Sequence, residues 1–407
     1  MKQAVFLVGG LGSRLGDVTR QTPKPLLPVS GRPFLDYLVE DIARHGITDV
    51  LFLAQFEADQ VSDYCNSTPL RARFGLSMNV AVEPDRAGTG GALWHARDHL
   101  DDRFLLLNGD SWVNGNYLSL SHILRGEDVE VAIALRRVPD VERYGQVTVD
   151  GKFVTSFAEK NAGSGEGYIN AGVYAMSREI LGYLTPDCSL ERDVLPRLVD
   201  ARRVGHVTFD GYFIDIGIPS TLTEARSDFV EHYRRPAVFF DRDGVLNVDH
   251  GHVGSVDRFE WMPGAIDAIR AVNDAGWFAF VVTNQAGVAK GYYDEQSVQV
   301  LHRHMQSELR RAGAHVDEFR YCPHHPEGSV ADYSMLCADR KPGPGMILDL
   351  LERWPVDAGQ SFLVGDKESD IEAARRASIR AVLYAERDPL NQWLERQCPP
   401  FPPFSLR

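Results

Sequence analysis

Short runs of apolar, strand-forming residues alternate along the whole chain with stretches of helical character. In the first half, the predicted strands are residues 4–8, 49–54, 104–107 and 131–135. In the second half, they are residues 237–240, 278–283 and 361–364. Strands that alternate with helices are typical of βαβ units. The pattern therefore predicts an α/β protein whose sheets are largely parallel.

This alternation is interrupted near residue 235. Residues 221–233 are typical of a closing helix, which Pro236 cannot continue because it lacks a backbone N–H. The basic pair before Pro236 suits an exposed linker, and a new strand begins directly after it. We therefore predict two domains, residues 1–233 and 236–407, with a loose, proline-rich end at 399–407.

Composition narrows the function classes. The chain has 407 residues, enough for two or three domains of about 150 residues each. Hydrophobic residues make up 44% and charged residues 25%, which excludes a disordered or fibrous chain. Lys and Arg number 43 against 57 Asp and Glu, and this net charge of −14 disfavours nucleic acid as a partner. Small phosphorylated ligands are compatible with this charge, because they need only backbone amides and one or two cations.

The cysteines and the apolar runs indicate the compartment. Five cysteines, odd in number and widely spread, argue against a disulfide scaffold and for a reducing cytosol. No apolar run approaches the roughly 18–20 residues of a transmembrane helix. The apolar start is read as a buried strand rather than a signal peptide, since it reaches Arg14 without a cleavage-type site. We expect a cytoplasmic protein whose partners are small-molecule substrates, with no nucleic acid and no membrane.

A glycine-rich loop follows the first strand. Residues 9–15 read Gly-Gly-Leu-Gly-Ser-Arg-Leu, and glycines let backbone amides approach phosphates closely. The spacing differs from the dinucleotide-binding and Walker A motifs. Lys24 stands between two prolines, which hold it in an extended segment. Arg14 and Lys24 together could neutralise a triphosphate; the alternative is that the loop is only a tight turn.

Two carboxylates follow at positions suited to a metal ion. Asp110 ends an apolar run, and Asp215 lies in the segment Tyr-Phe-Ile-Asp-Ile-Gly-Ile-Pro at 212–219. Carboxylates at strand ends can hold Mg²⁺ between phosphates. The alternative for Asp110 is a helix cap before Ser111.

The first half resembles the sugar-1-phosphate nucleotidyltransferases. The resemblance covers residues 1 to about 230 and rests on the loop at 9–15, the Pro-Lys-Pro block at 23–25, Asn108-Gly109-Asp110, Glu83-Pro84, 88–92, Glu159-Lys160, Asn170-Ala171-Gly172 and Asp215. In that family, an oxygen of a sugar 1-phosphate attacks the α-phosphate of a nucleoside triphosphate and pyrophosphate leaves. The protein supplies position and charge rather than covalent chemistry.

This resemblance assigns roles by position. It implies that Arg14 and Lys24 are catalytic and that Asp110 and Asp215 hold Mg²⁺. It implies a substrate site made by Gly9, Gly10, Gly12, Ser13, Gly90, Glu159, Lys160 and Asn170. Glu159 and Lys160 face the sugar phosphate in this interpretation; the alternative is an ordinary surface pair. The fold that it implies is a Rossmann-like domain with a mixed sheet.

The second half contains polar groups at the ends of three predicted strands. Asp241 and Asp243 follow the strand 237–240, and residues i and i+2 of an extended chain point the same way. Two such carboxylates can divide the work, since one can attack phosphorus while the other handles the proton of the leaving group. The second strand ends in Thr283, Asn284 and Gln285, and the third is followed by Asp366. Between them, Arg340 and Lys341 form a cationic pair directly before Pro342. Open parallel sheets bind their ligands at this edge.

These motifs resemble the haloacid dehalogenase phosphatase superfamily over about 237–385, which implies a second Rossmann-like domain with a parallel sheet. The resemblance implies that Asp241 is the nucleophile and Asp243 the general acid and base. It implies a phosphoryl site with Thr283 and Lys341, and Mg²⁺ held by Asp241, Asp243 and Asp366, with Lys367 adjacent but not a ligand. The alternative for the aspartate pair alone is a solvated turn.

An insert narrows the resemblance to the heptose 1,7-bisphosphate 7-phosphatases. Cys322, His324 and Cys337 have the spacing of a structural zinc site. The family's loop ends in a cysteine where this chain has Asp339, a residue type that zinc also accepts. The alternative is a loop without metal. The same resemblance implies that sugar and retained phosphate contact Asp249, His250, Gly251, His252 and Arg340, and that Asn284 and Gln285 complete the substrate site.

The two halves suggest consecutive reactions. The product of the second half, a sugar 1-phosphate, is the substrate type of the first. The first half resembles most closely the heptose 1-phosphate guanylyltransferases, which implies GTP and a GDP-heptose for a cell-surface polysaccharide such as lipopolysaccharide. Three alternatives stay open: another sugar or base for the transferase, a phosphatase similar to histidinol phosphatases, or one half that serves as a binding module without catalysis.

Overall fold

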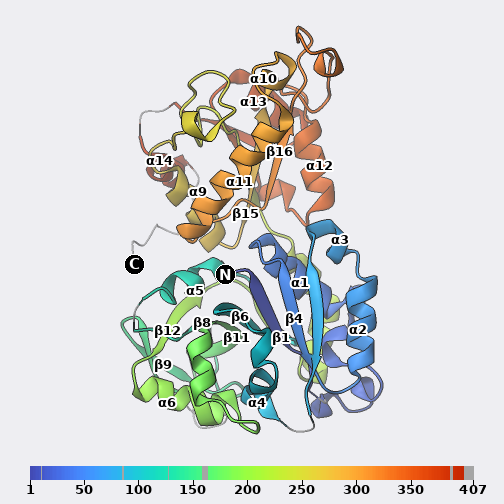
Figure 1. Ribbon diagram of the computed structural model, residues 1–407, viewed down its shortest axis with the longest axis vertical. Coiled ribbons are helices and arrows are strands. Elements are labelled where there is room, and N and C mark those ends of the chain that lie inside the picture. Colours follow the sequence, from blue (N-terminus) through green and yellow to red (C-terminus); the bar gives the residue numbers. More distant parts are fainter. Residues whose placement is uncertain (11, 85–86, 127, 158–163, 386–387, 398–407) are drawn as a thin grey trace. The chain divides into compact units, whose positions relative to one another are not determined.

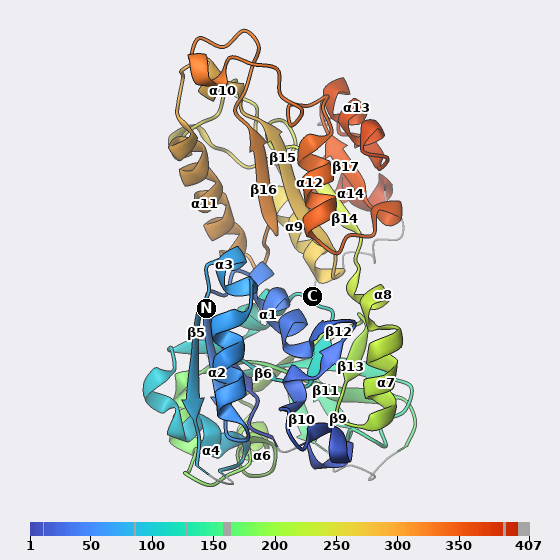
Figure 2. The same cartoon turned by 90° about the vertical axis from the view of Figure 1, so that its right-hand side faces the viewer.

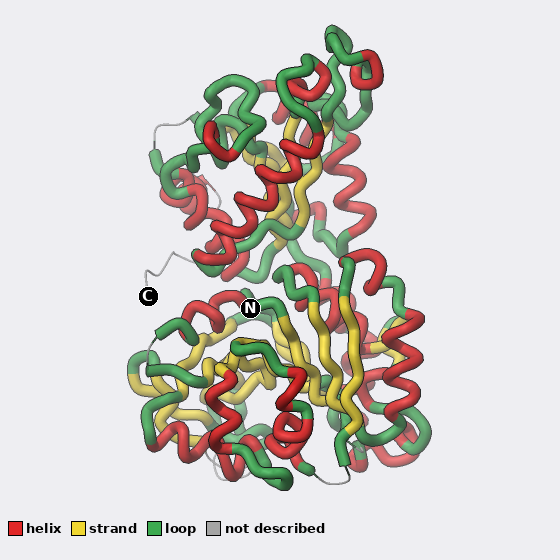
Figure 3. The backbone as a smooth tube through the Cα atoms, viewed as in Figure 1, coloured by secondary structure: helices red, strands yellow, loops and turns green. Residues whose placement is uncertain are grey.

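The computed structural model describes residues 1–10, 12–84, 87–126, 128–157, 164–385 and 388–397 (Figure 1). The chain forms two compact units, Met1–His232 and Tyr233–Arg407, here called the N-terminal and C-terminal units. In each unit helices flank a central sheet (Figure 3). Within the described ranges, every helix is too short or too polar to cross a lipid bilayer.

The N-terminal unit is built on a nine-stranded sheet with the order β5-β4-β1-β6-β11-β8-β12-β10-β9. Its strands are β1 (Gln3–Leu7), β4 (Asp49–Ala54), β5 (Ser77–Val82), β6 (Arg103–Asn108), β8 (Val131–Val138), β9 (Val147–Asp150), β10 (Phe153–Phe157), β11 (Gly167–Ser177) and β12 (Val204–Phe209). β1 pairs in parallel with β4 and β6, whereas β11 runs antiparallel to both β6 and β8. The sheet is therefore mixed, as the family resemblance implies, and the largely parallel sheet predicted from the apolar pattern is wrong for this unit.

The helices of this unit cover both faces of the sheet, so its central strands are apolar at nearly every position. They are α1 (Phe34–Arg44), α2 (Ala58–Ser67), α3 (Leu70–Phe74), α4 (Gly88–His95), α5 (Tyr117–Ile123), α6 (Leu195–Asp200), α7 (Pro219–Ser227) and α8 (Phe229–Tyr233). Val5, Leu106 and Ile133, from three of the strands, pack into one buried cluster. The single helix predicted at 221–233 is wrong, because α7 ends before Asp228 and α8 begins after it.

A short antiparallel pair outside the main sheet positions two of the predicted metal-binding carboxylates. β7 (Ser111–Val113) pairs with β13 (Phe213–Asp215), so that Asp215 lies opposite Ser111, the neighbour of Asp110. Figure 2 shows α7 beside β13.

The C-terminal unit has a five-stranded, fully parallel sheet with the order β16-β15-β14-β17-β18. The strands are β14 (Ala237–Phe240), β15 (Phe278–Asn284), β16 (Glu318–Cys322), β17 (Phe362–Gly365) and β18 (Arg380–Leu383). The helices are α9 (Ala265–Asp274), α10 (Ala286–Ala289), α11 (Glu295–Arg311), α12 (Gly345–Arg353), α13 (Glu368–Arg376) and α14 (Leu390–Gln397). β14 lies between β15 and β17, and the carboxyl ends of these three strands meet at one edge, where such sheets bind ligands.

Candidate active sites

In the N-terminal unit, the glycine loop follows β1 in a conformation that requires glycine. Gly12 has φ of 61°, in the left-handed region, and a Cβ there would lie 2.9 Å from Thr19 Cγ2. A Cβ on Gly9 would come within 2.2 Å of Glu83 Oε1. The loop then enters a 3₁₀ turn that leaves Ser13 and Arg14 exposed. The exposure of Ser13 and Arg14 suits the predicted phosphate site.

Lys24 is held against the predicted metal-binding carboxylates. Its side chain is largely buried, and its Nζ lies 2.6 Å from Oδ2 of Asp110. Asp215 is fixed by the backbone N–H of Gly217, which donates to its Oδ1 at 2.6 Å, and Arg143 lies 3.6 Å from the same oxygen. Burial raises the pKa of Asp215, and the charge of Asp110 raises it further.

This pair of carboxylates fits a divalent cation. Asp110 and Asp215 are close enough to repel each other, and both offer the hard oxygen donors that Mg²⁺ prefers. A cation between them would offset that repulsion, so the donor chemistry agrees with the predicted Mg²⁺ site.

Other residues predicted for this site have partners within the fold. Asn170 donates to the hydroxyl of Tyr174 at 2.6 Å and accepts from the backbone N–H of Gly172 at 2.9 Å. Gly90 is buried against Cys188, where a Cβ would lie 2.6 Å from the sulfur. Glu159 and Lys160 lie outside the described residues.

Glu83 lies beside the glycine loop. The sequence had given no role to this glutamate. It follows β5, and burial raises its pKa to about 7. The Glu-Pro pair was part of the family resemblance, but only the fold places its carboxylate against Gly9.

In the C-terminal unit, Asp241 lies at the end of β14 in a buried cluster of charges. Nζ of Lys341 lies 2.7 Å from Oδ1 of Asp241 and 2.6 Å from Oδ1 of Asp370. All three side chains are at most 8% exposed. Burial raises the pKa of Asp241 to about 7 although the ammonium of Lys341 opposes the shift. A carboxylate in so dry a place is less solvated and hence a better nucleophile.

Asp243 is held by a network that the sequence analysis missed in part. Arg242, which is fully buried, donates from Nη2 to Oδ1 at 2.9 Å and to Oδ2 at 3.0 Å. Asn247 donates to Oδ1 at 3.0 Å, and Gln285 donates to Oδ2 at 2.9 Å. A residue between two catalytic aspartates normally points away from them, so the sequence carried no signal for Arg242.

The carboxylates of this unit fit a second Mg²⁺ site. Oxygens of Asp241, Asp366 and Asp370 all lie within 4.8 Å of one another. Oδ1 of Asp366 is buried and has no hydrogen-bond partner in the described structure, so it suits a metal ion as its partner. Asp370 was not predicted for this site. Lys367 lies beside these carboxylates. Its Nζ is 3.4 Å from Oδ2 of Asp366 and 3.2 Å from Oδ2 of Asp249.

The residues at the end of β15, and Gln285 directly after it, serve the site differently from one another. Gln285 donates to Thr283 Oγ1 at 2.9 Å as well as to Asp243. Asn284 exchanges two hydrogen bonds of 3.0 Å with the backbone of Lys341. We therefore read Asn284 as a residue that positions Lys341 rather than as a direct substrate contact.

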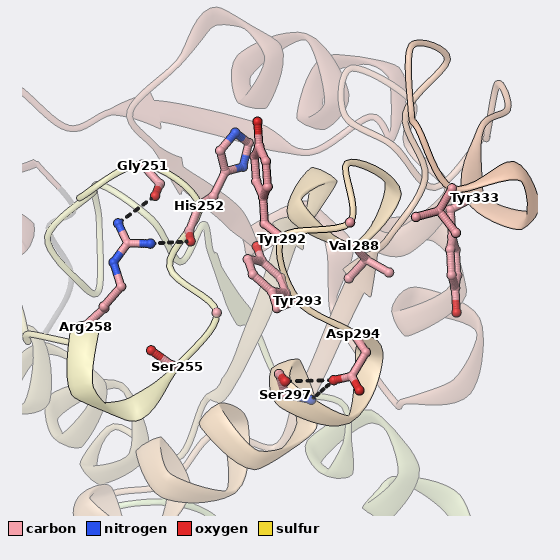
Figure 4. A pocket seen from close by; sticks show the side chains of 13 residues that line it. Gly251, His252, Ser255, Arg258, Val288, Tyr292, Tyr293, Asp294, Ser297 and Tyr333 are labelled. Atoms are coloured by element: carbon pink, nitrogen blue, oxygen red, sulfur yellow. Dashed lines mark hydrogen bonds between the residues drawn. The ribbon is translucent and has the colours of Figure 1, made fainter.

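A loop and a cavity adjoin this cluster. Arg258 donates to the carbonyl oxygens of Gly251 and His252 (Figure 4), and to that of His250. These bonds keep the loop in place although His252 has φ of 53°. The loop borders a cavity of about 810 Å³. Tyr293, on its wall, donates to Gln285 at 2.9 Å, so the cavity is linked to the network around Asp243.

The predicted zinc ligands are brought together in part. Donor atoms of Cys322, His324 and Cys337 lie within 4.8 Å of one another. Burial raises the pKa of Cys322 to about 12, and the charge of Cys337 contributes. Thiol and imidazole donors fit Zn²⁺. Asp339 is not in this group, since its Oδ1 lies beside Gly345 at the start of α12.

Comparisons with known proteins agree with this division of chemistry. The nucleotidyl transferase family matches residues 3–232, and the HAD-hydrolase-like family matches residues 338–400. A D-glycero-beta-D-manno-heptose-1,7-bisphosphate 7-phosphatase from Rhodopseudomonas palustris is 51% identical over 155 residues, which are 38% of this chain and 86% of that protein.

Two solved structures are similar to this chain over 56% of its length. HddC from Yersinia pseudotuberculosis is 31% identical with a TM-score of 0.51, over 56% of this chain and 100% of that chain. A second structure of HddC, complexed with GMP-PN, is 32% identical with a TM-score of 0.50 over the same shares.

Proposed function

The chain belongs to the nucleotidyl transferase family and to the D-glycero-beta-D-manno-heptose-1,7-bisphosphate 7-phosphatase family, and from this we propose that it is one enzyme with two consecutive activities. It removes the 7-phosphate of a heptose 1,7-bisphosphate and then couples the heptose 1-phosphate to a nucleotide. We assign the transferase to residues 1–233 and the phosphatase to residues 236–407. The observation that supports the proposal is that each unit holds a lysine–aspartate pair among its predicted site residues, Lys24 with Asp110 in one and Lys341 with Asp241 in the other.

The phosphatase reaction follows from the buried cluster. Asp241 attacks the phosphorus of the 7-phosphate, and Asp243 gives its proton to the departing sugar oxygen. Water, deprotonated by Asp243, then attacks the aspartyl phosphate, which releases inorganic phosphate and restores Asp241. Lys341 holds the phosphoryl oxygens. Mg²⁺ held by Asp241, Asp366 and the backbone carbonyl of Asp243 would supply charge compensation for the phosphoryl group.

The transferase reaction needs position and charge. An oxygen of the heptose 1-phosphate attacks the α-phosphorus of the nucleoside triphosphate, and pyrophosphate leaves. The amides of the glycine loop, Arg14 and Lys24 hold the triphosphate and stabilise the charge on the leaving group. Mg²⁺ held by Asp110 and Asp215 would neutralise phosphate oxygens. Similarity to HddC, which has been solved with GMP-PN, supports GTP as the nucleotide and a GDP-heptose as the product.

We propose further that Cys322, His324 and Cys337 hold a structural Zn²⁺, because they form a group of thiol and imidazole donors. We also propose a cytoplasmic location, where the nucleoside triphosphate substrate is available. The activated heptose would serve as a precursor of a polysaccharide such as lipopolysaccharide.

A coupled assay tests the two activities together. Purified protein with Mg²⁺ receives the α or the β anomer of heptose 1,7-bisphosphate with GTP, ATP, UTP or dTTP. We expect phosphate and pyrophosphate to appear together, with a nucleotide sugar as the product. Asp241→Asn should abolish phosphate release while pyrophosphate still forms from added heptose 1-phosphate. Pyrophosphate with another nucleotide would correct the base, and hydrolysis of histidinol phosphate instead of the bisphosphate would overturn the phosphatase assignment.

A further inference from the structure

The zinc site proposed for the C-terminal unit differs from a closed structural site in the number of its protein ligands. Structural Zn²⁺ sites almost always have four such ligands, whereas sites with three keep one position for water or another small ligand. In the part of the chain that the structure describes, the donors that come together are the thiols of Cys322 and Cys337 and the imidazole of His324. The residues around this group therefore decide whether a fourth protein ligand is at hand.

The three donors are spaced as a metal ion requires. Sγ of Cys322 lies 3.7 Å from Nδ1 of His324. Two ligands of a tetrahedral Zn²⁺, at about 2.3 Å for sulfur and about 2.0 Å for nitrogen, are about 3.5 Å apart. Cys322 is fully buried, while His324 and Cys337 are half-buried. A metal ion bound here would have one buried ligand and two ligands at the surface.

Asp339, the residue at the last ligand position of the family, is held elsewhere. The segment that contains it folds back on itself, because the backbone N–H of Gly345 donates to the carbonyl of Ala338 at 3.1 Å. Oδ1 of Asp339 packs on Gly345, where a Cβ would lie only 2.3 Å from this oxygen. The carboxylate thus lies at the start of α12 and does not join the three donors.

His325, the neighbour of His324, has partners of its own. Its Nδ1 accepts a hydrogen bond from the backbone N–H of Glu327 at 3.1 Å, and its backbone N–H donates to the carbonyl of Tyr333 at 3.1 Å. Like Asp339, His325 is not part of the group of donors. Beside Cys337, Leu336 is 87% exposed, so this edge of the site is open to solvent.

We propose that the chain binds Zn²⁺ through Cys322, His324 and Cys337 alone and leaves the fourth position to a ligand from solution. Water fills this position in the absence of a better donor. A small thiol displaces the water as its thiolate and gives its proton to the solvent, because thiolates are preferred ligands of Zn²⁺. The inference rests on the zinc site of the proposed function and does not depend on the substrates of either unit.

Cobalt makes the fourth ligand visible, because each thiolate bound to Co²⁺ adds a charge-transfer absorption. The probe is 2-mercaptoethanol, added to the full chain loaded with Co²⁺. We expect this absorption to rise and to saturate at one added thiol per site. Asp339→Asn and His325→Gln should bind Zn²⁺ within about twofold of the unmodified protein and show the same rise.

Asp339→Cys provides the matched variant with a closed site. Loss of even an outer-shell partner of a metal ligand costs about 10- to 100-fold in affinity, so a fourth direct donor should tighten binding by at least about 10-fold. Competition with a chelator measures this gain. The cobalt form of Asp339→Cys should show no rise with 2-mercaptoethanol, because the new thiol occupies the fourth position.

The remaining thiol of this unit, Cys398, lies outside the described residues. Cys398→Ser should bind Zn²⁺ and take up the added thiol as the unmodified protein does. Loss of metal affinity in this variant, in Asp339→Asn or in His325→Gln would make that side chain the fourth ligand, and would overturn the open position while the zinc site stands. A cobalt spectrum of the unmodified protein that does not respond to the thiol would overturn it as well. If neither the unmodified protein nor Asp339→Cys binds Zn²⁺ or Co²⁺, the zinc site itself is wrong, and the open position with it.

Discussion

The ammonium of Lys24 lies 2.6 Å from Oδ2 of Asp110, although 86 positions separate the two residues in the chain. The contact places a cation from the segment after the glycine loop against a carboxylate from the end of β6. Asp110 partly neutralises the charge of Lys24. In the proposed transferase reaction, a bound triphosphate would compete with Asp110 for the ammonium of Lys24.

Replacing Lys24 should therefore disable one activity only. We expect Lys24→Met to lower kcat/KM for nucleotidyl transfer about 10²- to 10³-fold, because an electrostatic contact to the reacting phosphates is lost. Phosphate release from the bisphosphate should be unchanged. The control is Lys152→Met, an exposed lysine of the same unit. A transfer rate close to that of the unmodified enzyme would show that Lys24 only pairs with Asp110.

Arg242 should act through Asp243. Its buried guanidinium contacts both oxygens of Asp243, so Arg242→Lys keeps the charge but loses the fork that fixes the carboxylate. We expect kcat of the phosphatase to fall about 10- to 100-fold, with a shifted pH profile. Arg303→Lys, on the exposed side of α11, is the matched control.

A double-mutant cycle tests whether Arg242 acts through this partner. In the Asp243→Asn background, Arg242→Lys should cause little further loss, because the group that it positions is already absent. Full additivity of the two effects would show that Arg242 acts on stability instead.

The cysteine and histidine group should bind zinc. We expect protein purified without chelators to contain about one Zn²⁺ per chain. Cys337→Ser should lose most of it, because within the described ranges the assembled group consists of three thiol or imidazole donors. Elemental analysis measures this directly. Cys65→Ser, in the other unit, should retain the metal. Zinc-free protein of full phosphatase activity would mean that the loop holds its shape without metal.

Glu83 should make stability depend on pH near neutrality. Burial raises its pKa from 4.5 to about 7, so the folded state holds its proton more tightly than the unfolded state does. The contribution of Glu83 to stability is therefore greatest below about pH 4.5, and it is lost as the pH rises through about 7. The loss is about 1–2 kcal/mol after allowance for partial exposure.

Glu83→Gln removes this titration. The increase in the free energy of unfolding, variant minus unmodified protein, should be larger at pH 8 than at pH 5. Denaturant unfolding, followed through the transition of the N-terminal unit, measures it. Glu142→Gln, an exposed change of the same type, should show no such difference. A gain that is equal at both pH values would contradict the raised pKa.

Much of the fold could be predicted from local pattern. The predicted strands at 49–54 and 237–240 coincide with β4 and β14, because each is a run of apolar residues bounded by polar or turn residues. The antiparallel course of β11 was not visible in the pattern, since a buried strand has the same composition in either direction. The break between α7 and α8 at Asp228 was also missed, because helical periodicity continues across it.

The candidate sites show the same division. Asp241, Lys24 and Asp110 were proposed from motifs in which residue type and spacing carry the signal. Asp370 was not, although the structure places it at Lys341. It belongs to an ordinary helical segment, and nothing in its neighbours along the chain shows which strand end it faces.

The chain order of apolar runs, glycines, prolines and acidic residues predicts two α/β halves, a glycine loop suited to phosphate and a pair of neighbouring carboxylates, because these depend on backbone preferences and on residues near each other in sequence. Which charges share one buried space depends on the sheet order and on the paths of the loops. The ion pairs of Lys341 with Asp241 and Asp370, and of Lys24 with Asp110, arise only when distant strands pair. Their strength depends on the exclusion of water, and only the packed fold provides that exclusion.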